Sequence, residues 1–201
     1  MLNISIDTLI NQLADNSLAV SDEAFPKHLS ELLLQDLDRL HQVGAFQQAA
    51  IGRGGSLQVQ KQIRGDQTYW LDENPDSQTQ KDFLDFMREL QKKLNESFFI
   101  GLQEIEAHYA LYPPGAGYDK HIDQHAHTAY RKITFILYLN PQWQPGDGGE
   151  LLIFDPQNPE QVLTQIQPLF GRFILFRSEV FPHQVATSGR DRKSLTGWLR
   201  A

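Results

Sequence analysis

The character of the sequence changes near residue 105, and this change constrains the fold more than any other feature. Downstream of it, short runs rich in β-branched and aromatic residues alternate with turn signals. The runs are Ile105–Tyr112, Ile133–Leu139, Leu151–Phe154, Phe173–Phe176, Gln184–Ala186 and Ser194–Leu199. Proline and glycine sequences such as Pro113-Pro114-Gly115 separate them. Short strands in this arrangement predict a double-sheet jelly roll.

The first part of the chain carries helical periodicity instead. Apolar residues recur every three or four positions in several segments, and this spacing predicts helices. The segments are Ile6–Leu13, Leu29–Leu40, with Pro26 in its first turn, and Phe83–Leu94, which begins near Ser77. The stretch Gly52–Asp66 alternates weakly and could form a hairpin, but it is too polar for a core strand.

No linker, internal repeat or low-complexity tract separates the two parts. We therefore predict one α+β domain over residues 1–201, a double-stranded β-helix (jelly-roll) barrel backed by N-terminal helices. In this interpretation residues 1–100 are mainly helical support and residues 105–200 form the jelly-roll core. A chain of 201 residues is long enough to bury such a core.

Composition narrows the class of protein. Lysine and arginine total 18 against 25 aspartates and glutamates, so the net charge is −7, which disfavours a nucleic-acid partner. Cysteine is absent, which excludes disulfides and thiolate sites and fits a reducing cytosol. The N-terminus lacks the layout of a signal peptide, and no apolar run approaches the roughly 20 residues that span a bilayer. We expect a cytoplasmic protein without a membrane or nucleic-acid partner.

The sequence His121-Ile122-Asp123 is the sharpest candidate for chemistry. Side chains two residues apart in an extended chain point to the same face, so this imidazole and this carboxylate can converge. With His183 downstream they make two histidines and one carboxylate, the facial triad of non-haem Fe(II) oxygenases. His121 and Asp123 taken without His183 have a competing interpretation, in which a surface histidine lies beside a solvated aspartate.

A local metal site is a second alternative, because His125 and His127 share the parity of His121 and Asp123. A strand rises about 3.3 Å per residue, which spreads these four positions too far for one metal ion. The sequence therefore favours the triad that includes His183.

The C-terminal strand places an arginine near the triad. Parity puts Arg192, Ser194, Thr196 and Trp198 on one face. If Ser188–Asp191 form a hairpin turn, Thr187 pairs with Arg192, His183 lies opposite Thr196, and Arg192 points into the barrel. A buried guanidinium suits bidentate binding of a carboxylate. The alternative is an exposed strand arginine, since Arg190 and Lys193 nearby have the character of solvated residues.

These residues, in this order, resemble the Fe(II)/2-oxoglutarate dioxygenases. Several further motifs resemble the prolyl 4-hydroxylase branch of that family. They are Tyr112-Pro113-Pro114-Gly115, Gly117-Tyr118, the strand Arg131–Asn140, Trp143 and Gly148-Gly149-Glu150-Leu151. The segment Ile63–Trp70 resembles the end of the finger loop, here residues 52–70, and the following strand of the oxygen-sensing prolyl hydroxylase domain enzymes and their bacterial relatives.

The resemblance implies roles for individual residues. It makes His121, Asp123 and His183 the iron ligands, and it makes Arg192 and Tyr138 the partners of the far carboxylate of 2-oxoglutarate. It places Tyr112 at the mouth of the pocket, Thr196 near the iron-bound water and Trp198 beside the pocket. It places Arg64 and Asp66 over the entrance as a substrate lid, near Arg131. We predict that Asp66 and Arg131 form an exposed pair when the lid closes over a peptide.

The resemblance also implies the activity: hydroxylation of a prolyl residue to 4-hydroxyproline, with conversion of 2-oxoglutarate to succinate and CO2. It implies Fe(II), 2-oxoglutarate and O2, with ascorbate as an auxiliary reductant. The expected partner is an intracellular protein with a proline in a flexible loop, such as a translation elongation factor. Two alternatives stay open: an oxygenase of free amino acids or other small molecules, and a non-enzymatic, cupin-like metal- or ligand-binding module.

Overall fold

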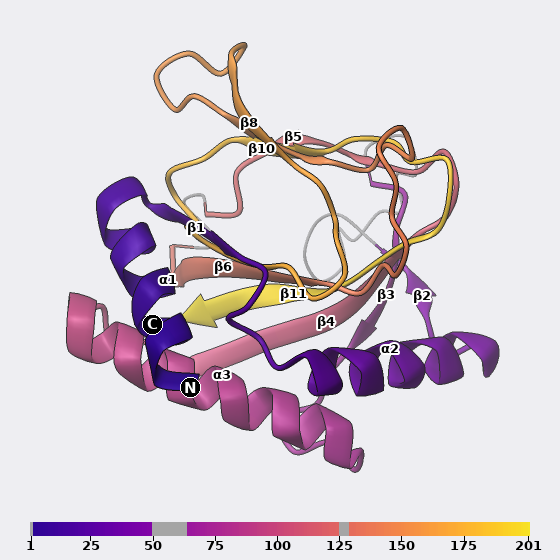
Figure 1. Cartoon of the computed structure of the whole chain (residues 1–201), viewed down its shortest axis with the longest axis horizontal. Helices are drawn as coiled ribbons and strands as arrows, with labels where there is room; N and C mark the ends of the chain where they lie inside the picture. Colours follow the sequence, from indigo (N-terminus) through magenta and orange to yellow (C-terminus); the bar gives the residue numbers. More distant parts are fainter. Residues whose placement is uncertain (1, 50–63, 125–128) are drawn as a thin grey trace.

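Two antiparallel sheets face each other, and helices cover the outer face of the larger sheet (Figure 1). The structure is a computed structural model, and it describes residues 2–49, 64–124 and 129–201. Most of the finger loop, as well as His125 and His127, therefore lies outside the described residues.

The structure contains the helices that the apolar periodicity of the N-terminal part predicts. They are α1 (Leu2–Asn16), α2 (Lys27–Gln42) and α3 (Gln78–Phe98). Pro26 is extended and stands immediately before α2, and Phe99, immediately after α3, is in a left-handed conformation with φ 54°. Among the described residues, none of the helices combines the length and apolar character needed to cross a bilayer.

The larger sheet carries most of the long strands. Within the described residues its order is β1-β9-β6-β11-β4-β3-β2. Its strands are β1 (Leu18–Ser21), β2 (Gln47–Gln48), β3 (Gln67–Trp70), β4 (Glu104–Tyr112), β6 (Arg131–Tyr138), β9 (Phe173–Arg177) and β11 (Arg192–Arg200). The long strands β4 and β11 pair over nine residues, from Arg192 opposite Tyr112 to Arg200 opposite Glu104.

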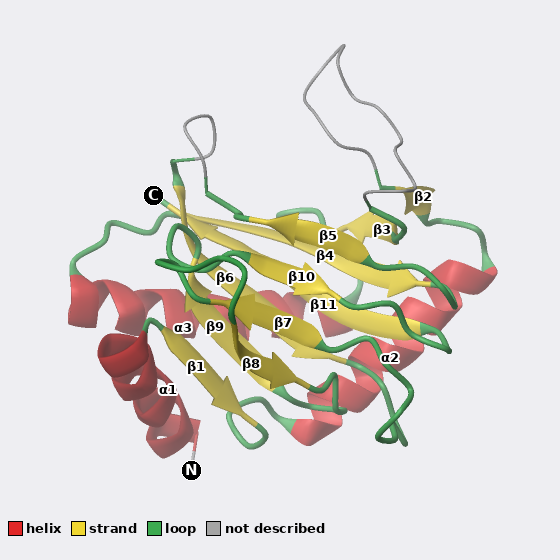
Figure 2. Cartoon of the chain, turned by 90° about the horizontal axis from the view of Figure 1, so that it is seen from above, coloured by secondary structure: helices red, strands yellow, loops and turns green. Residues whose placement is uncertain are grey.

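The smaller sheet closes the barrel over the inner face of the larger one (Figure 2). Its order is β5-β10-β7-β8. Its strands are β5 (Tyr118–His121), β7 (Leu151–Phe154), β8 (Val162–Ile166) and β10 (His183–Val185). The predicted jelly-roll barrel backed by N-terminal helices is confirmed.

Alternation along the strands divides the core in two. On β4 and β6, Tyr109, Phe135 and Leu137 face the helices and join their apolar stripes in one cluster. Their sequence neighbours Ala110 and Tyr138 face the other way, into the barrel between the two sheets. Because side chains of a strand alternate, one run of residues serves both the structural core and the site.

The proposed C-terminal hairpin is wrong. Strand β10 pairs with β5 and β7 in the smaller sheet, whereas β11 pairs with β4 and β6 in the larger sheet. His183 consequently lies opposite His121 and Ile153, not opposite Thr196. A jelly roll passes successive strands from one sheet to the other, so neighbours in sequence need not pair. The parity of β11 survives, since Leu195 and Leu199 pack with the helices.

Gly197 on β11 lies close against the backbone of β4. A Cβ atom at this position would overlap the carbonyl group of Glu106 and lie 2.9 Å from the Cα of Ala107. Both neighbours are backbone atoms, which cannot swing aside as the end of a side chain can.

We expect Gly197→Ala to lower the free energy of unfolding by about 3 kcal/mol, because the added methyl group forces the two strands apart. Urea unfolding measures this value. Gly189→Ala is the matched control, since its Cβ would meet nothing closer than an oxygen at 3.8 Å. Equal stability of the two variants would contradict the tight approach of β11 and β4.

Candidate active site

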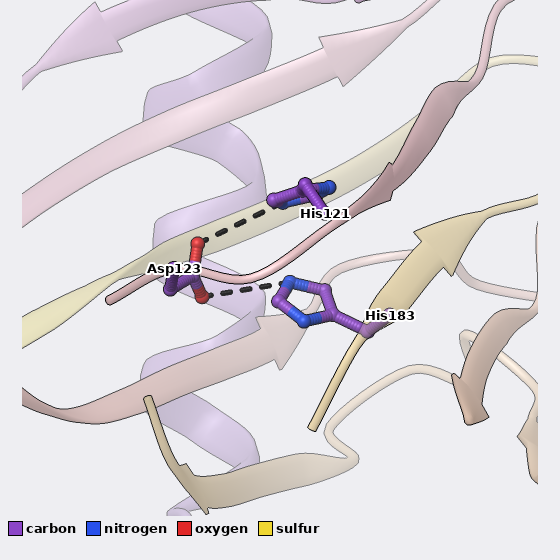
Figure 3. Close-up of side chains that lie close together, drawn as sticks. All are labelled: His121, Asp123 and His183. Atoms are coloured by element: carbon purple, nitrogen blue, oxygen red, sulfur yellow. Dashed lines mark ion pairs between the residues drawn. The ribbon is translucent and has the colours of Figure 1, made fainter. Parts of the chain in front are cut away.

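Three side chains from two adjacent strands converge inside the barrel: His121 ends β5, Asp123 follows it by two residues, and His183 begins β10 (Figure 3). Potential ligand atoms of the three lie within 4.8 Å of one another. The pairing of His183 with His121 across the two strands brings the distant histidine to the His-x-Asp sequence. The structure thus assembles the predicted triad.

Backbone carbonyl groups fix the orientation of both imidazole rings. Nδ1 of His121 lies 2.7 Å from the carbonyl oxygen of Asp119, and Nδ1 of His183 lies 3.0 Å from that of Phe181. A carbonyl oxygen only accepts hydrogen bonds, so each Nδ1 carries the proton and each Nε2 presents a lone pair. The Nε2 atoms lie 3.7 and 3.5 Å from the Asp123 carboxylate. In this tautomer both Nε2 lone pairs are free to bind a metal ion.

A hydrogen bond from a residue of β6 fixes the carboxylate of Asp123. The hydroxyl group of Thr134 donates to Oδ2 at 2.8 Å and lies 2.9 Å from the hydroxyl of Ser178. Burial opposes ionisation of Asp123, but the neighbouring His183 and His121 and the bond from Thr134 hold its pKa below the usual value. Burial and the neighbouring His183 lower the pKa of His121 to about 4. The triad at neutral pH is therefore a carboxylate with a neutral imidazole at His121, ready to coordinate.

This donor set fits Fe(II). Two imidazole nitrogens and one carboxylate oxygen are the ligands that non-haem Fe(II) takes on one face, leaving other coordination positions open. Thiolates are not available, because the chain has no cysteine. A neighbouring group forms a hydrogen bond with each of the three ligands, as expected for a metal site.

Arg192 is buried in the same barrel, as the parity of β11 predicts. It is 2% exposed. Its Nε donates to the carbonyl oxygen of Gly149 at 2.8 Å, and Nη2 donates to the hydroxyl of Tyr138 at 3.1 Å. The guanidinium carbon lies 5.2 and 4.8 Å from the ring centres of Tyr112 and Tyr138. Among the described residues no carboxylate forms an ion pair with it. A buried cation without a partner charge is a binding site for an anion.

Glycine makes this arrangement possible. Gly149 has φ +72°, and a Cβ there would lie 3.2 Å from Cδ of Arg192 and 3.1 Å from the ring of Trp143. The glycine therefore adopts a left-handed conformation and lets its carbonyl group approach the guanidinium. Gly149 was included in a family motif from the sequence, but its contact with Arg192 was not predicted.

Thr196 and Trp198 lie on the barrel face of β11. The hydroxyl of Thr196 donates to the carbonyl oxygen of Phe135 at 2.8 Å. Trp198 is buried, and the guanidinium of Arg131 lies 3.4 Å above its ring. Their predicted catalytic roles stay predictions, whereas their positions agree with the alternation of the strand.

The predicted lid pair is wrong in one respect: Asp66 is not an exposed residue. Its side chain is fully buried, and Arg64 binds it through two hydrogen bonds of 2.7 and 3.0 Å. Arg131 pairs with Glu106 at 2.9 Å instead. Arg64 lies two residues from Asp66, so both side chains lie on one side of the chain, whereas stacking on Trp198 holds Arg131 beside Glu106. Asp66 is therefore a buried residue of the folded structure and not an exposed residue of a lid.

We expect Asp66→Ala to lower the free energy of unfolding by about 3 kcal/mol, because it leaves the mostly buried guanidinium of Arg64 unpaired. Urea unfolding provides the measurement. Asp7→Ala removes an exposed partner of Lys93 and should change stability by only about 0–1 kcal/mol. A loss for Asp66→Ala no larger than for Asp7→Ala would contradict a structural role for the Arg64–Asp66 pair.

Several residues around the triad were assigned no role from the sequence. Tyr118 stacks on His121 with ring centres 3.7 Å apart, and Thr134 and Ser178 hold Asp123. His108 lies on the barrel face of β4, opposite Thr196. The parity of β4 could have identified His108, but the contacts of Thr134 and Ser178 depend on strands distant in sequence.

Comparisons with known proteins agree with this geometry. A model of the 2OG-Fe(II) oxygenase superfamily matches residues 107–200, which include the triad and Arg192. Egl nine homolog 1 of Mus musculus is 26% identical over 204 residues, covering 98% of the chain and 50% of that protein. The chain spans about half the length of the first curated relatives that it matches.

Two solved structures are similar over nearly the whole chain. A Pseudomonas putida prolyl-4-hydroxylase is 34% identical with a TM-score of 0.87, covering 98% of this chain and 99% of that one. A Trichoplax adhaerens prolyl hydroxylase, solved in complex with a peptide fragment of the hypoxia inducible factor oxygen degradation domain, is 28% identical with a TM-score of 0.85. That match covers 99% of this chain and 90% of that one. The two solved structures are of prolyl hydroxylases, and the chain belongs to the 2OG-Fe(II) oxygenase superfamily.

Proposed function

We propose that the protein hydroxylates a prolyl residue of a polypeptide to 4-hydroxyproline, using Fe(II), 2-oxoglutarate and O2. In the overall reaction one oxygen atom of O2 enters the alcohol and the other enters succinate, while 2-oxoglutarate loses CO2. The observation that carries the proposal is the unpaired guanidinium of Arg192, bonded to Tyr138 in the barrel that holds the triad. A dicarboxylic acid can bind this cation at one end and a metal ion at the other.

Each residue has a defined part in the proposed reaction. His121, Asp123 and His183 would hold Fe(II), which supplies the activation of O2 when it is bound. Thr134 keeps the Asp123 carboxylate in place, and the carbonyl groups of Asp119 and Phe181 keep both histidines in the ligating tautomer. Arg192 and the Tyr138 hydroxyl would bind the far carboxylate of 2-oxoglutarate and so orient the cosubstrate. The ring of Tyr112 lies beside the guanidinium of Arg192 and lines the same part of the barrel.

The relatives support a prolyl substrate, because both structures compared above are of prolyl hydroxylases. The peptide complex of the Trichoplax protein supports a polypeptide over a free amino acid. We further propose that the target is a cytoplasmic protein with a proline in a flexible loop, with a translation elongation factor as the first to test. Ascorbate is proposed as the auxiliary reductant.

Mass spectrometry of lysate proteins tests the proposal. The lysate is incubated with the full chain, Fe(II) and 2-oxoglutarate, and tryptic peptides are searched for prolines that gain one oxygen atom. We expect such prolines, and succinate, only when 2-oxoglutarate is present. Succinate formation stimulated by free proline but not by polypeptides would indicate the small-molecule alternative. No added oxygen and no succinate would contradict an oxygenase activity.

A further inference from the structure

His108 is a buried histidine on the barrel face of β4, and none of the roles above uses it. Its side chain is 1% exposed and lies in the row of Thr196 on β11 and Trp70 on β3. Its ring centre lies 4.3 Å from that of Trp70 and 5.8 Å from that of Trp198. The imidazole is therefore part of the aromatic wall that includes Trp198.

Arg64 determines which nitrogen of His108 carries the proton. Nη2 of Arg64 lies 3.5 Å from Nε2 of His108, at the long end of hydrogen-bond distance. A guanidinium only donates hydrogen bonds, so Nε2 must present its lone pair and the proton resides on Nδ1. Burial and the charges of Arg64 and Arg131 hold the pKa of His108 well below its usual value, which keeps the ring neutral.

The Nδ1–H group of His108 is then a buried hydrogen-bond donor. Nδ1 has no hydrogen-bond partner among residues 2–49, 64–124 and 129–201. A buried polar group that lacks a partner is costly, and such groups in folded proteins often belong to binding sites. Trp70 is the exposed member of the stack, at 47%, so the stack with His108 reaches the protein surface at this ring.

The neighbouring charges indicate which acceptor fits. The two arginines near His108 already have carboxylate partners, Arg64 in Asp66 and Arg131 in Glu106. Asp66 and Glu106 offset part of the positive charge of Arg64 and Arg131, which weakens the attraction for a carboxylate at this position. An uncharged carbonyl oxygen, as in a peptide group, matches a neutral N–H donor between tryptophan rings better than the carboxylate of a free amino acid does.

We propose that His108 is a substrate-binding residue, whose Nδ1–H donates a hydrogen bond to a backbone carbonyl oxygen of the polypeptide substrate. This inference rests on the proposed function and deepens it, since it selects peptide groups over free amino acids. It places this contact with the substrate on the barrel face of the adjacent strands β3, β4 and β11, near Trp198.

Two variants separate the two ring nitrogens. The side-chain amide nitrogen of asparagine lies near the position of Nδ1, whereas that of glutamine lies near Nε2. His108→Gln should raise the KM for substrate polypeptide about tenfold, the effect of losing one hydrogen bond of about 1.4 kcal/mol, while changing kcat less. His108→Asn should restore most of the affinity. His28→Gln is the matched control, since the His28 side chain is 82% exposed and distant in sequence from the barrel strands.

Binding provides a readout independent of turnover. Calorimetry without O2, on the Fe(II)-loaded chain with 2-oxoglutarate, uses the blocked peptide Ac-Ala-Pro-Ala-NH2 and free proline as probes. We expect the wild-type protein to bind the peptide and to prefer it to proline, with a Kd about tenfold higher in His108→Gln. Equal peptide Kd values in wild type and His108→Gln would overturn the role of His108 while leaving the proposed function intact. A wild-type protein that neither binds the peptide nor oxidises lysate prolines would overturn both.

The tautomer is testable without any substrate. In ¹⁵N spectra of the full chain, loaded with Zn(II) as a diamagnetic substitute for iron and with 2-oxoglutarate, His108 is assigned by the signal lost in His108→Gln. We expect the proton on Nδ1 and an unprotonated Nε2. A proton on Nε2 would make Nδ1 an acceptor and would overturn the inference.

Discussion

We expect His183→Ala to reduce iron-dependent succinate formation by at least about a hundredfold. Asp123 and His121 would remain as protein ligands, and two anchors hold a metal ion far more weakly than three do. The bound iron, measured by elemental analysis after gel filtration, should fall well below one ion per chain. The circular dichroism spectrum should keep its shape, since β10 pairs through backbone atoms with β5 and β7.

His28→Ala is the matched control for this substitution, because the His28 side chain is 82% exposed. It should retain both iron and turnover. Full iron content and undiminished turnover in His183→Ala would contradict the assignment of the triad.

Arg192→Ala is expected to raise the KM for 2-oxoglutarate about a hundredfold. The substitution removes the buried guanidinium and thus a charge-assisted, potentially bidentate pair with the far carboxylate. The iron content should stay at the wild-type level, because Arg192 is not a metal ligand. Initial rates over a range of 2-oxoglutarate concentrations give the KM.

Arg190→Ala tests whether any nearby positive charge would have the same effect. Arg190 stands two residues upstream, is 44% exposed and pairs with Asp147. Its removal should leave the KM for 2-oxoglutarate unchanged. If Arg192→Ala also left this KM unchanged, the cosubstrate would have to bind elsewhere in the barrel.

Most of the fold was predictable because its signals are local. The helices follow apolar periodicity, and the long strands β4, β6 and β11 follow runs of β-branched and aromatic residues. The strands β1, β2, β5 and β8 were missed. Tyr118–His121 and Val162–Ile166 contain several polar or exposed residues, and Leu18–Ser21 is only four residues long. Such segments become strands because a neighbouring strand offers hydrogen bonds, which periodicity does not reveal.

The residues of the triad and Arg192 could be predicted from the sequence, but the contacts that hold them in place could not. The sequence His121-Ile122-Asp123, the later His183 and the resemblance to a family identified the triad. The argument for Arg192 reached the right face of β11 through a hairpin that does not exist. The parity of one strand fixes its faces whichever strand lies beside it, and this is why the conclusion survived the wrong pairing.

The sequence by itself determined the alternation within each strand, the helical stripes and the residue types available for a metal ion, since each depends on neighbours in the chain. Only the tertiary structure decided which distant groups meet: Asp66 with Arg64 in a buried pair, Thr134 with Asp123, and His108 with two tryptophans. The pairing of β10 with β5 placed His183 beside His121, and the pairing of β11 with β4 placed Thr196 beside His108. Those contacts depend on how the strands are distributed between two sheets. That distribution follows from burying both faces of the larger sheet at once, a property of the whole chain and not of any one segment.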